Sequence, residues 1–228
     1  MKQILKNNLP FFIPYAFIWL CILVIVLTTT KLEQMTFINS LNSTFGDWFF
    51  YGATQLGEGW FWGVTIILFL FVRYDKSLIF STSLVLSTLL SSSLKLFFDT
   101  LRPMAFFKDL KQNWHFVDGV KINIHQSFPS GHTTTAFAIF TLIMLFAKNR
   151  NWGYACVTLA WLAGYSRCYL FQHFPVDVLG GATIGMMSSL IVYIWFSSRY
   201  VKNPKDWHGQ SLRQRQKKGS LHFGRRLP

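Results

Sequence analysis

The chain of 228 residues is poor in charged side chains, and in acidic ones above all. Charged residues make up 14% of it, with nine Asp and Glu, whereas 51% of the residues are hydrophobic and the mean hydropathy is +0.31. A soluble domain has about 25% charged residues. This deficit argues against a disordered chain, a coiled coil and a small secreted fold, and it predicts an integral membrane protein.

Cysteine is scarce as well. Cys21, Cys156 and Cys168 lie in or next to apolar runs and form neither a CxxC nor a Cys/His ligand pattern. The spacing argues against a zinc site and a disulfide framework. It predicts that the three thiols are packing residues.

The positive charge is concentrated at one end of the chain. The formal net charge is +13, and residues 199–228 contribute nine Lys and Arg against one Asp. The excess is therefore a terminal feature and does not indicate a nucleic-acid-binding domain. We expect 199–228 to be a disordered, basic cytoplasmic tail, solvated or attracted to anionic headgroups, that follows a membrane domain at 1–198.

Six apolar segments approach the roughly 20 residues that a helix needs to cross a membrane. They lie at 10–30, 49–72, 77–98, 131–147, 152–171 and 177–197. The first follows Lys2 and Lys6 as in a signal peptide, but no small-residue cleavage site follows it, so we interpret it as an uncleaved anchor. The fold prediction is an all-α polytopic membrane protein with six transmembrane helices.

Basic residues at the ends of these segments predict the orientation. With six spans, one side of the membrane receives Lys2, Lys6, Arg73, Lys76, Lys148, Arg150 and the tail. The positive-inside rule makes that side cytoplasmic. The long 99–130 loop falls on the opposite side, although it carries Arg102, Lys108, Lys111 and Lys121. These cations oppose the rule and need another explanation.

Small and hydroxylated residues predict how the helices pack. The segment 77–98 contains nine Ser and Thr, and Gly181 and Gly185 form a GxxxG pattern in the last segment. Such residues allow close approach and hydrogen bonds between membrane helices. We therefore assign both features to helix packing.

Polar residues gather at three places, all at segment ends on the side opposite the tail. They are Lys95 with Arg102 and Pro103, then Ser130 with Gly131 and His132, then Arg167 with His173 and Asp177. Each of these residues has a simpler explanation when it is taken alone. The Lys95 side chain could extend to the membrane surface, and Arg102 could be an ordinary loop charge. Ser130 could simply cap a helix, with His132 as a histidine at the membrane interface. Ionisable groups within membrane segments are costly and usually functional. Three cations, two histidines and a carboxylate together indicate an anionic ligand.

Phosphate chemistry suits these residue types. Free N–H groups at a helix start by Ser130 and Gly131 would bind an anion, and the Arg167 guanidinium suits phosphate oxygens. His173 and Asp177 are four residues apart, which on a first helical turn would place them on one face. A carboxylate at one ring nitrogen leaves the other available as a nucleophile.

The three patches together resemble the signature of the type 2 phosphatidic acid phosphatase family of membrane lipid phosphatases. The matching sets are Lys95-x6-Arg102-Pro103, Pro129-Ser130-Gly131-His132 and Ser166-Arg167-x5-His173-x3-Asp177. The resemblance implies that His173 attacks phosphorus, that Asp177 orients it and that His132 acts as acid and base. It also implies that the phosphate oxygens are held by Lys95, Arg102, Pro103, Ser130, Gly131 and Arg167. No metal or cofactor is implied.

The resemblance leaves the substrate open. The candidates are phosphatidylglycerol phosphate, phosphatidic acid, undecaprenyl pyrophosphate and lipid A, and the basic, aromatic 106–128 loop favours a polyanionic headgroup. Transfer of phosphate between lipids is an alternative to hydrolysis, and a transporter is disfavoured because the charges cluster at helix ends. We expect a bacterial inner membrane, an active site facing the periplasm or cell exterior, and no nucleic-acid partner; the oligomeric state stays open. Asp99 receives no role, and His115 and His125 are predicted to be surface residues.

Overall fold

The computed structural model describes residues 2–121, 123–203, 205 and 207–213, and this part of the chain is helical without strands. The helices are α1 (Lys2–Asn7), α2 (Leu9–Thr28), α3 (Lys31–Ser40), α4 (Thr44–Ala53), the 3-10 turn η1 (Thr54–Gly57), α5 (Gly59–Val72), α6 (Tyr74–Phe98), α7 (Pro103–Phe106), α8 (Gly131–Phe146), α9 (Trp152–Tyr169) and α10 (Pro175–Lys202). All six predicted segments are therefore helical.

The centre of the bundle is a close pair of helices, α8 and α10. A Cβ added to Gly181 would lie 2.5 Å from the Ser130 carbonyl oxygen, and one on Gly185 would overlap the Thr134 carbonyl oxygen. Only glycine permits this approach, so the packing role predicted for the GxxxG pattern is confirmed. Helix α6 joins the pair through hydroxyls, since the Ser83 and Ser189 Oγ atoms lie 2.8 Å apart. The hydroxylated segment thus bonds across a helix interface, as predicted.

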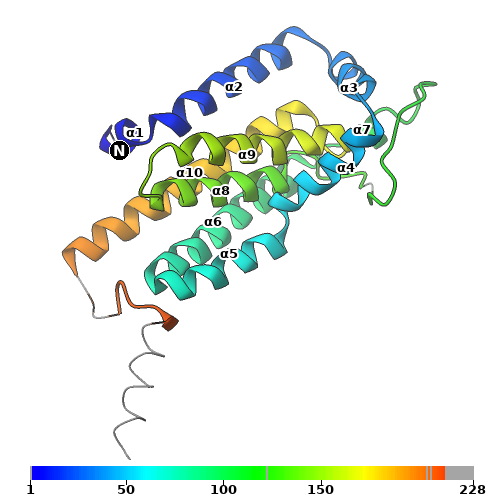
Figure 1. Cartoon of the computed structure of the whole chain (residues 1–228). Helices are drawn as coiled ribbons and strands as arrows, with labels where there is room; N and C mark the ends of the chain where they lie inside the picture. Colours follow the sequence, from blue (N-terminus) through cyan, green and yellow to red (C-terminus); the bar gives the residue numbers. More distant parts are fainter. Residues whose placement is uncertain (1, 122, 204, 206, 214–228) are drawn as a thin grey trace, which may run out of the picture.

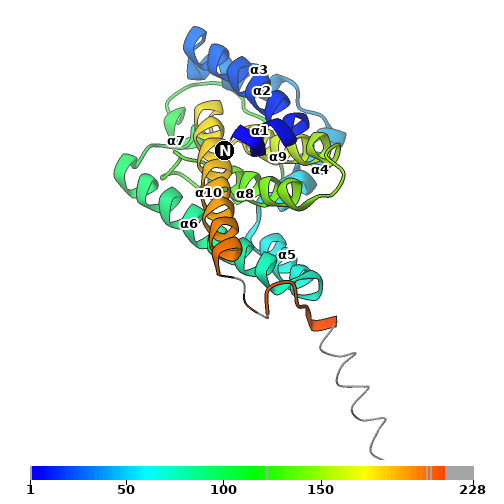
Figure 2. The same cartoon turned by 90° about the vertical axis from the view of Figure 1, so that its left-hand side faces the viewer.

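Other helices flank this centre on two sides. Figure 1 shows α2 on one side of α10 and α5 with α6 on the other, and Figure 2 shows α6 crossing α10. Trp19 of α2 donates to Thr183 Oγ1 of α10 at 3.1 Å. The outward face of α2 exposes large apolar side chains, with Phe17 at 68% and Leu27 at 75%. A contiguous apolar surface of this kind is covered by lipid in a membrane protein.

Length and composition single out fewer spans than predicted. Among the described residues, α2, α6 with its continuation to Phe106, and α10 are long and apolar enough, and α4–η1 with α5 forms a fourth candidate bent by 54°. Helix α8 is apolar but shorter than these spans, and most of its side chains are buried in the core. The count of six therefore stays a prediction.

The connections contain more structure than the sequence predicted. The 31–47 stretch, which connects the first two predicted segments, contains α3 and the start of α4. Thr30 and Glu33 form a capping box that starts α3, a local signal that hydropathy does not register. Figure 1 places α3, α7 and the long loop at one end of the bundle and the N-terminus with the end of α10 at the other.

The first part of the predicted tail contacts the helices. Helix α10 continues to Lys202, and the Tyr74 backbone N–H donates to the Gln210 carbonyl at 2.9 Å. The rings of Tyr200 and His208 lie 4.0 Å apart. The remainder of the tail, including Arg215, Lys217 and Lys218, lies outside the described residues.

Candidate active site

The first signature patch is held by carbonyls of the long loop. Lys95 lies in the last turn of α6, and its Nζ donates to the Gln126 carbonyl at 2.6 Å. Arg102 donates through Nε to the His125 carbonyl at 2.9 Å and through Nη1 to Gln172 Oε1 at 3.1 Å. Pro103 is buried as the first residue of α7. The loop thus fixes both cations where the chain turns back.

The second patch forms the N-terminus of α8. Ser130 is its N-cap, as its residue type predicted, and the fully buried side chain accepts from the Thr133 N–H at 3.4 Å. A Cβ on Gly131 would lie 3.9 Å from Lys95 Cε, so the helix start faces this lysine. His132 Nε2 lies 2.7 Å from Glu58 Oε1. A helix N-terminus beside a lysine is a favourable place for an anion.

Arg167 is buried in the last turn of α9. It is 6% exposed, and Nη1 donates to Thr54 Oγ1 at 2.7 Å. Its Nε is buried and has no hydrogen-bond partner among the described residues. A buried N–H without a partner is costly, and a phosphate oxygen would satisfy it.

His173 and Asp177 meet in a different way from the predicted one. Helix α10 starts at Pro175, so His173 precedes the first turn and does not share a helical face with Asp177. The Asp177 carboxylate instead folds back to accept from the Phe174 N–H at 2.8 Å and from Ser127 Oγ at 2.6 Å. Its Oδ2 lies 3.4 Å from His173 Nδ1. Helix capping therefore places the carboxylate beside the imidazole.

Burial dominates the electrostatics of His173. The side chain is 1% exposed, and this burial lowers the pKa of His173 to about 3, although Asp177 acts in the opposite direction. The nearby cations Arg102 and Arg167 lower the pKa further. The ring is therefore neutral near pH 7, as a nitrogen nucleophile must be.

Residues far apart in the sequence converge at one end of the bundle. Arg102 and Arg167 lie within electrostatic range of both His132 and His173. Lys95 lies within electrostatic range of both arginines and of Asp177. The Ser130 N–H donates to the Asp177 carbonyl at 3.0 Å, which joins the second patch to the third. The arrangement combines three cations with two imidazoles, a set suited to phosphoryl chemistry.

Several residues of this site escaped the sequence analysis. They are the partners Thr54, Glu58, Ser127 and Gln172, which contact Arg167, His132, Asp177 and Arg102 respectively. None belongs to the signature. The one available signal was Glu58, an acid inside the predicted apolar segment 49–72.

The two loop histidines differ from each other. His125 is exposed, as predicted. His115 is half-buried instead, because its Nε2 lies 3.0 Å from both carboxylate oxygens of Asp47 and its backbone N–H donates to Asn39. This ring ties the long loop to α4.

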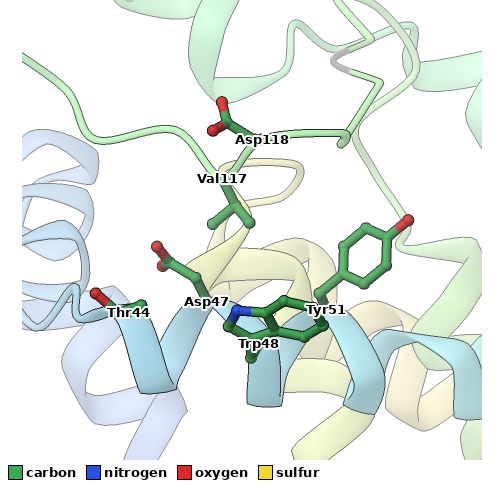
Figure 3. Close-up of a pocket in the computed structure, with 6 residues that line it drawn as sticks. All are labelled: Thr44, Asp47, Trp48, Tyr51, Val117 and Asp118. Carbon is green, nitrogen blue, oxygen red and sulfur yellow. The ribbon is translucent and has the colours of Figure 1, made fainter.

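A separate cavity of 370 Å³ lies beside this bridge. It is lined by Thr44, Asp47, Trp48, Tyr51, Val117 and Asp118. Figure 3 shows the α4 side chains on one side and Val117 of the long loop on the other. None of the signature residues lines it, so the cavity is distinct from the candidate active site.

Comparisons with known proteins agree with this geometry. The sequence profile of the PAP2 superfamily matches residues 76–200. The crystal structure of LpxE from Aquifex aeolicus has a TM-score of 0.63 and 31% identity, and the match covers 72% of this chain and 94% of LpxE. The lipid A 4'-phosphatase of Porphyromonas gingivalis is 27% identical over 168 residues, 68% of each chain.

A higher identity is confined to a shorter stretch. The undecaprenyl-diphosphatase BcrC of Bacillus subtilis is 42% identical over 67 residues, which cover 29% of this chain and only 34% of BcrC. The superfamily match, in contrast, spans more than half of the chain and contains every signature residue from Lys95 to Asp177. This integral membrane chain therefore belongs to the PAP2 superfamily.

Proposed function

We propose that the protein is a lipid phosphatase that removes phosphate from a lipid phosphate or diphosphate through a phosphohistidine at His173. The observation that carries the proposal is a fully buried imidazole with a carboxylate 3.4 Å from Nδ1, among cations from the other signature patches. This leaves Nε2 as the attacking atom.

The proposed reaction has two displacements. In the first, His173 Nε2 forms a bond to phosphorus, the bond to the leaving oxygen breaks, and His132 gives that oxygen a proton. In the second, His132 takes a proton from water, whose oxygen attacks phosphorus, and inorganic phosphate leaves the ring. Lys95, Arg102 and Arg167, with the N-terminus of α8, stabilise the charge on the phosphoryl oxygens.

An apolar groove beside the site supports a lipid substrate. Its volume is 470 Å³, and its lining combines α2 and α3 with α9 and α10: Ile22, Ile25, Thr29, Glu33, Gln34, Phe37, Ile38, Trp161, Tyr165, Cys168, Pro175 and Val178. Cys168 follows Arg167 directly, and Pro175 is two residues from His173. We propose that a lipid chain lies in this groove while its phosphate occupies the site.

The candidate substrates are phosphatidylglycerol phosphate, phosphatidic acid, undecaprenyl pyrophosphate and lipid A. Relatives named for lipid A and for undecaprenyl diphosphate, together with the basic 106–128 loop, favour the last two. Lipid-to-lipid phosphotransfer remains the alternative, because a second lipid could accept the phosphate in place of water. We place the enzyme in a bacterial inner membrane with its site facing the periplasm, opposite the basic helix ends.

A phosphate-release panel tests the proposal. Purified wild-type protein should release inorganic phosphate from at least one of the four lipids, and His173→Ala should lose about 10³-fold or more in kcat because the nucleophile is gone. His208→Ala, at the other end of the bundle, is the matched control and should retain activity. Normal turnover by folded His173→Ala would refute the nucleophile. Phosphate recovered only on a second lipid would establish transfer.

A further inference from the structure

The bend between α4 and α5 contacts the site from outside the signature. A Cβ on Gly57 would lie 2.6 Å from the His132 carbonyl oxygen, so the backbone of η1 packs directly on this residue. Thr54 accepts from Arg167 Nη1 at 2.7 Å, and Glu58 Oε1 lies 2.7 Å from His132 Nε2. One turn thus touches both a cation and an imidazole of the signature.

His132 stands between opposing charges. Arg167 of α9 and Arg102 before α7 act on it across the site, and Lys95 of α6 flanks the neighbouring Gly131. Glu58 is the carboxylate at hydrogen-bond distance from His132, and a carboxylate in this position favours the protonated ring. A general acid needs that proton when the leaving oxygen departs.

We propose that Glu58 is a positioning residue for His132, fixing the ring with Nε2–H directed to the carboxylate and Nδ1 directed to the leaving oxygen of the substrate. This inference rests on the proposed phosphatase function. In the first step the Nδ1 proton passes to the leaving oxygen as the P–O electron pair moves onto it, and the ring stays bonded to Glu58 as a neutral imidazole. In the second step Nδ1 takes the proton of the attacking water.

The two imidazoles then form complementary pairs. Asp177 Oδ2 lies 3.4 Å from Nδ1 of His173 and leaves Nε2 for phosphorus, whereas Glu58 lies at hydrogen-bond distance from Nε2 of His132 and leaves Nδ1 for the proton. A carboxylate bonded to one ring nitrogen determines which nitrogen is free. The family signature contains only the first of these carboxylates.

Glu58→Gln keeps the size of the side chain and removes its charge. We expect kcat for a lipid phosphate, which has a poor alkoxide leaving group, to fall about 10²-fold. The loss should be under about 10-fold with p-nitrophenyl phosphate, whose leaving group needs little protonation. The alkaline limb of kcat should move to lower pH. Asp109→Asn, which removes an exposed acid of the long loop, is the matched control and should change none of these quantities.

Two kinetic results would overturn the inference. The first is wild-type kinetics in Glu58→Gln. The second is an equal loss of kcat with every leaving group together with an unchanged pH profile, because this would make Glu58 a purely structural residue.

Ring nitrogen NMR of His132 in detergent gives a readout that needs no turnover. Glu58→Gln should make this ring lose its proton at lower pH, and an unchanged titration would refute the pairing. A wild-type protein inactive on all four lipids would refute the phosphatase proposal, while the NMR result would still decide the pairing.

Discussion

His173 combines three properties that rarely meet in one histidine. It is 1% exposed, it lies within electrostatic range of two arginines, and its Nδ1 lies 3.4 Å from the Asp177 carboxylate. Burial disfavours the charged ring more strongly than the carboxylate favours it, so the lone pair of the ring stays available. The cations that repel a ring proton are the same ones that would attract phosphate. The site therefore favours an anionic ligand and a neutral nucleophile together.

The pH dependence of kcat/KM follows from this balance. A protonated ring cannot attack phosphorus, and burial lowers the pKa of His173 from 6.5 to about 3. Protonation therefore begins only well below pH 6.5, and the acidic limb due to His173 should lie there. A profile from about pH 4 to about pH 8 should therefore show no His173 limb near pH 6.5, once the titration of the substrate phosphate near pH 6 has been determined by phosphorus NMR. An enzyme limb centred at pH 6.5 would contradict a neutral buried nucleophile.

The sequence identified the residues of the site by their spacing, but not the contacts that hold them. Lys95 and Arg167 are recognisable because cations are costly in apolar segments, and Arg102 by its spacing from Lys95. Their partners include the main-chain carbonyls of His125 and Gln126, whose positions depend on the path of a long loop. Side-chain identity carries no information on such carbonyls, so this part of the site required the structure.

At the scale of helices, hydropathy located every apolar segment but not the bend or the caps. The 54° break at η1 has no proline, and it arises where Gly57 packs against α8. This is a tertiary contact that no local pattern encodes. The GxxxG pattern of α10 was predictable, in contrast, because its function is close approach itself.

The groove between α2 and α9 yields a test at this scale. Ile25 of α2 lines the groove and is 48% exposed, so Ile25→Trp should fill part of it without disturbing the core. We expect KM for a long-chain lipid phosphate to rise about 10-fold, the cost of roughly two lost methylene contacts, while kcat for p-nitrophenyl phosphate stays unchanged. Ile13→Trp is the control, because Ile13 is 60% exposed on the same helix and does not line the groove. Equal KM values in the two variants would exclude the groove as the chain site.

At the scale of the whole molecule, the basic connections gather away from the signature. Arg150, after α8, donates to Asn8 before α2 at 3.1 Å, and Lys76 at the start of α6 lies 4.8 Å from the Phe146 ring centroid. The segment around Gln210 bonds to the start of α6 as well. Chain ends and turns that are distant in sequence thus share one end of the bundle. The positive-inside rule predicts that this end faces the cytoplasm.

Labelling of single cysteines distinguishes the six-span prediction from a four-span arrangement. Both arrangements place Asp109 on the outer side if the N-terminus is cytoplasmic. With six spans Asn149 lies in the cytoplasm, at the Asn8 end to which the neighbouring Arg150 donates. If α8 and α9 do not cross, Asn149 lies outside and this contact must break. In a chain lacking its native cysteines, we expect a membrane-impermeant maleimide to label Asp109→Cys in intact spheroplasts. Asn149→Cys should react only after permeabilisation. Labelling of both variants in intact spheroplasts would favour four spans. Labelling of Asn149→Cys alone in intact spheroplasts would place the proposed phosphate site in the cytoplasm, because the signature lies at the Asp109 end of the bundle.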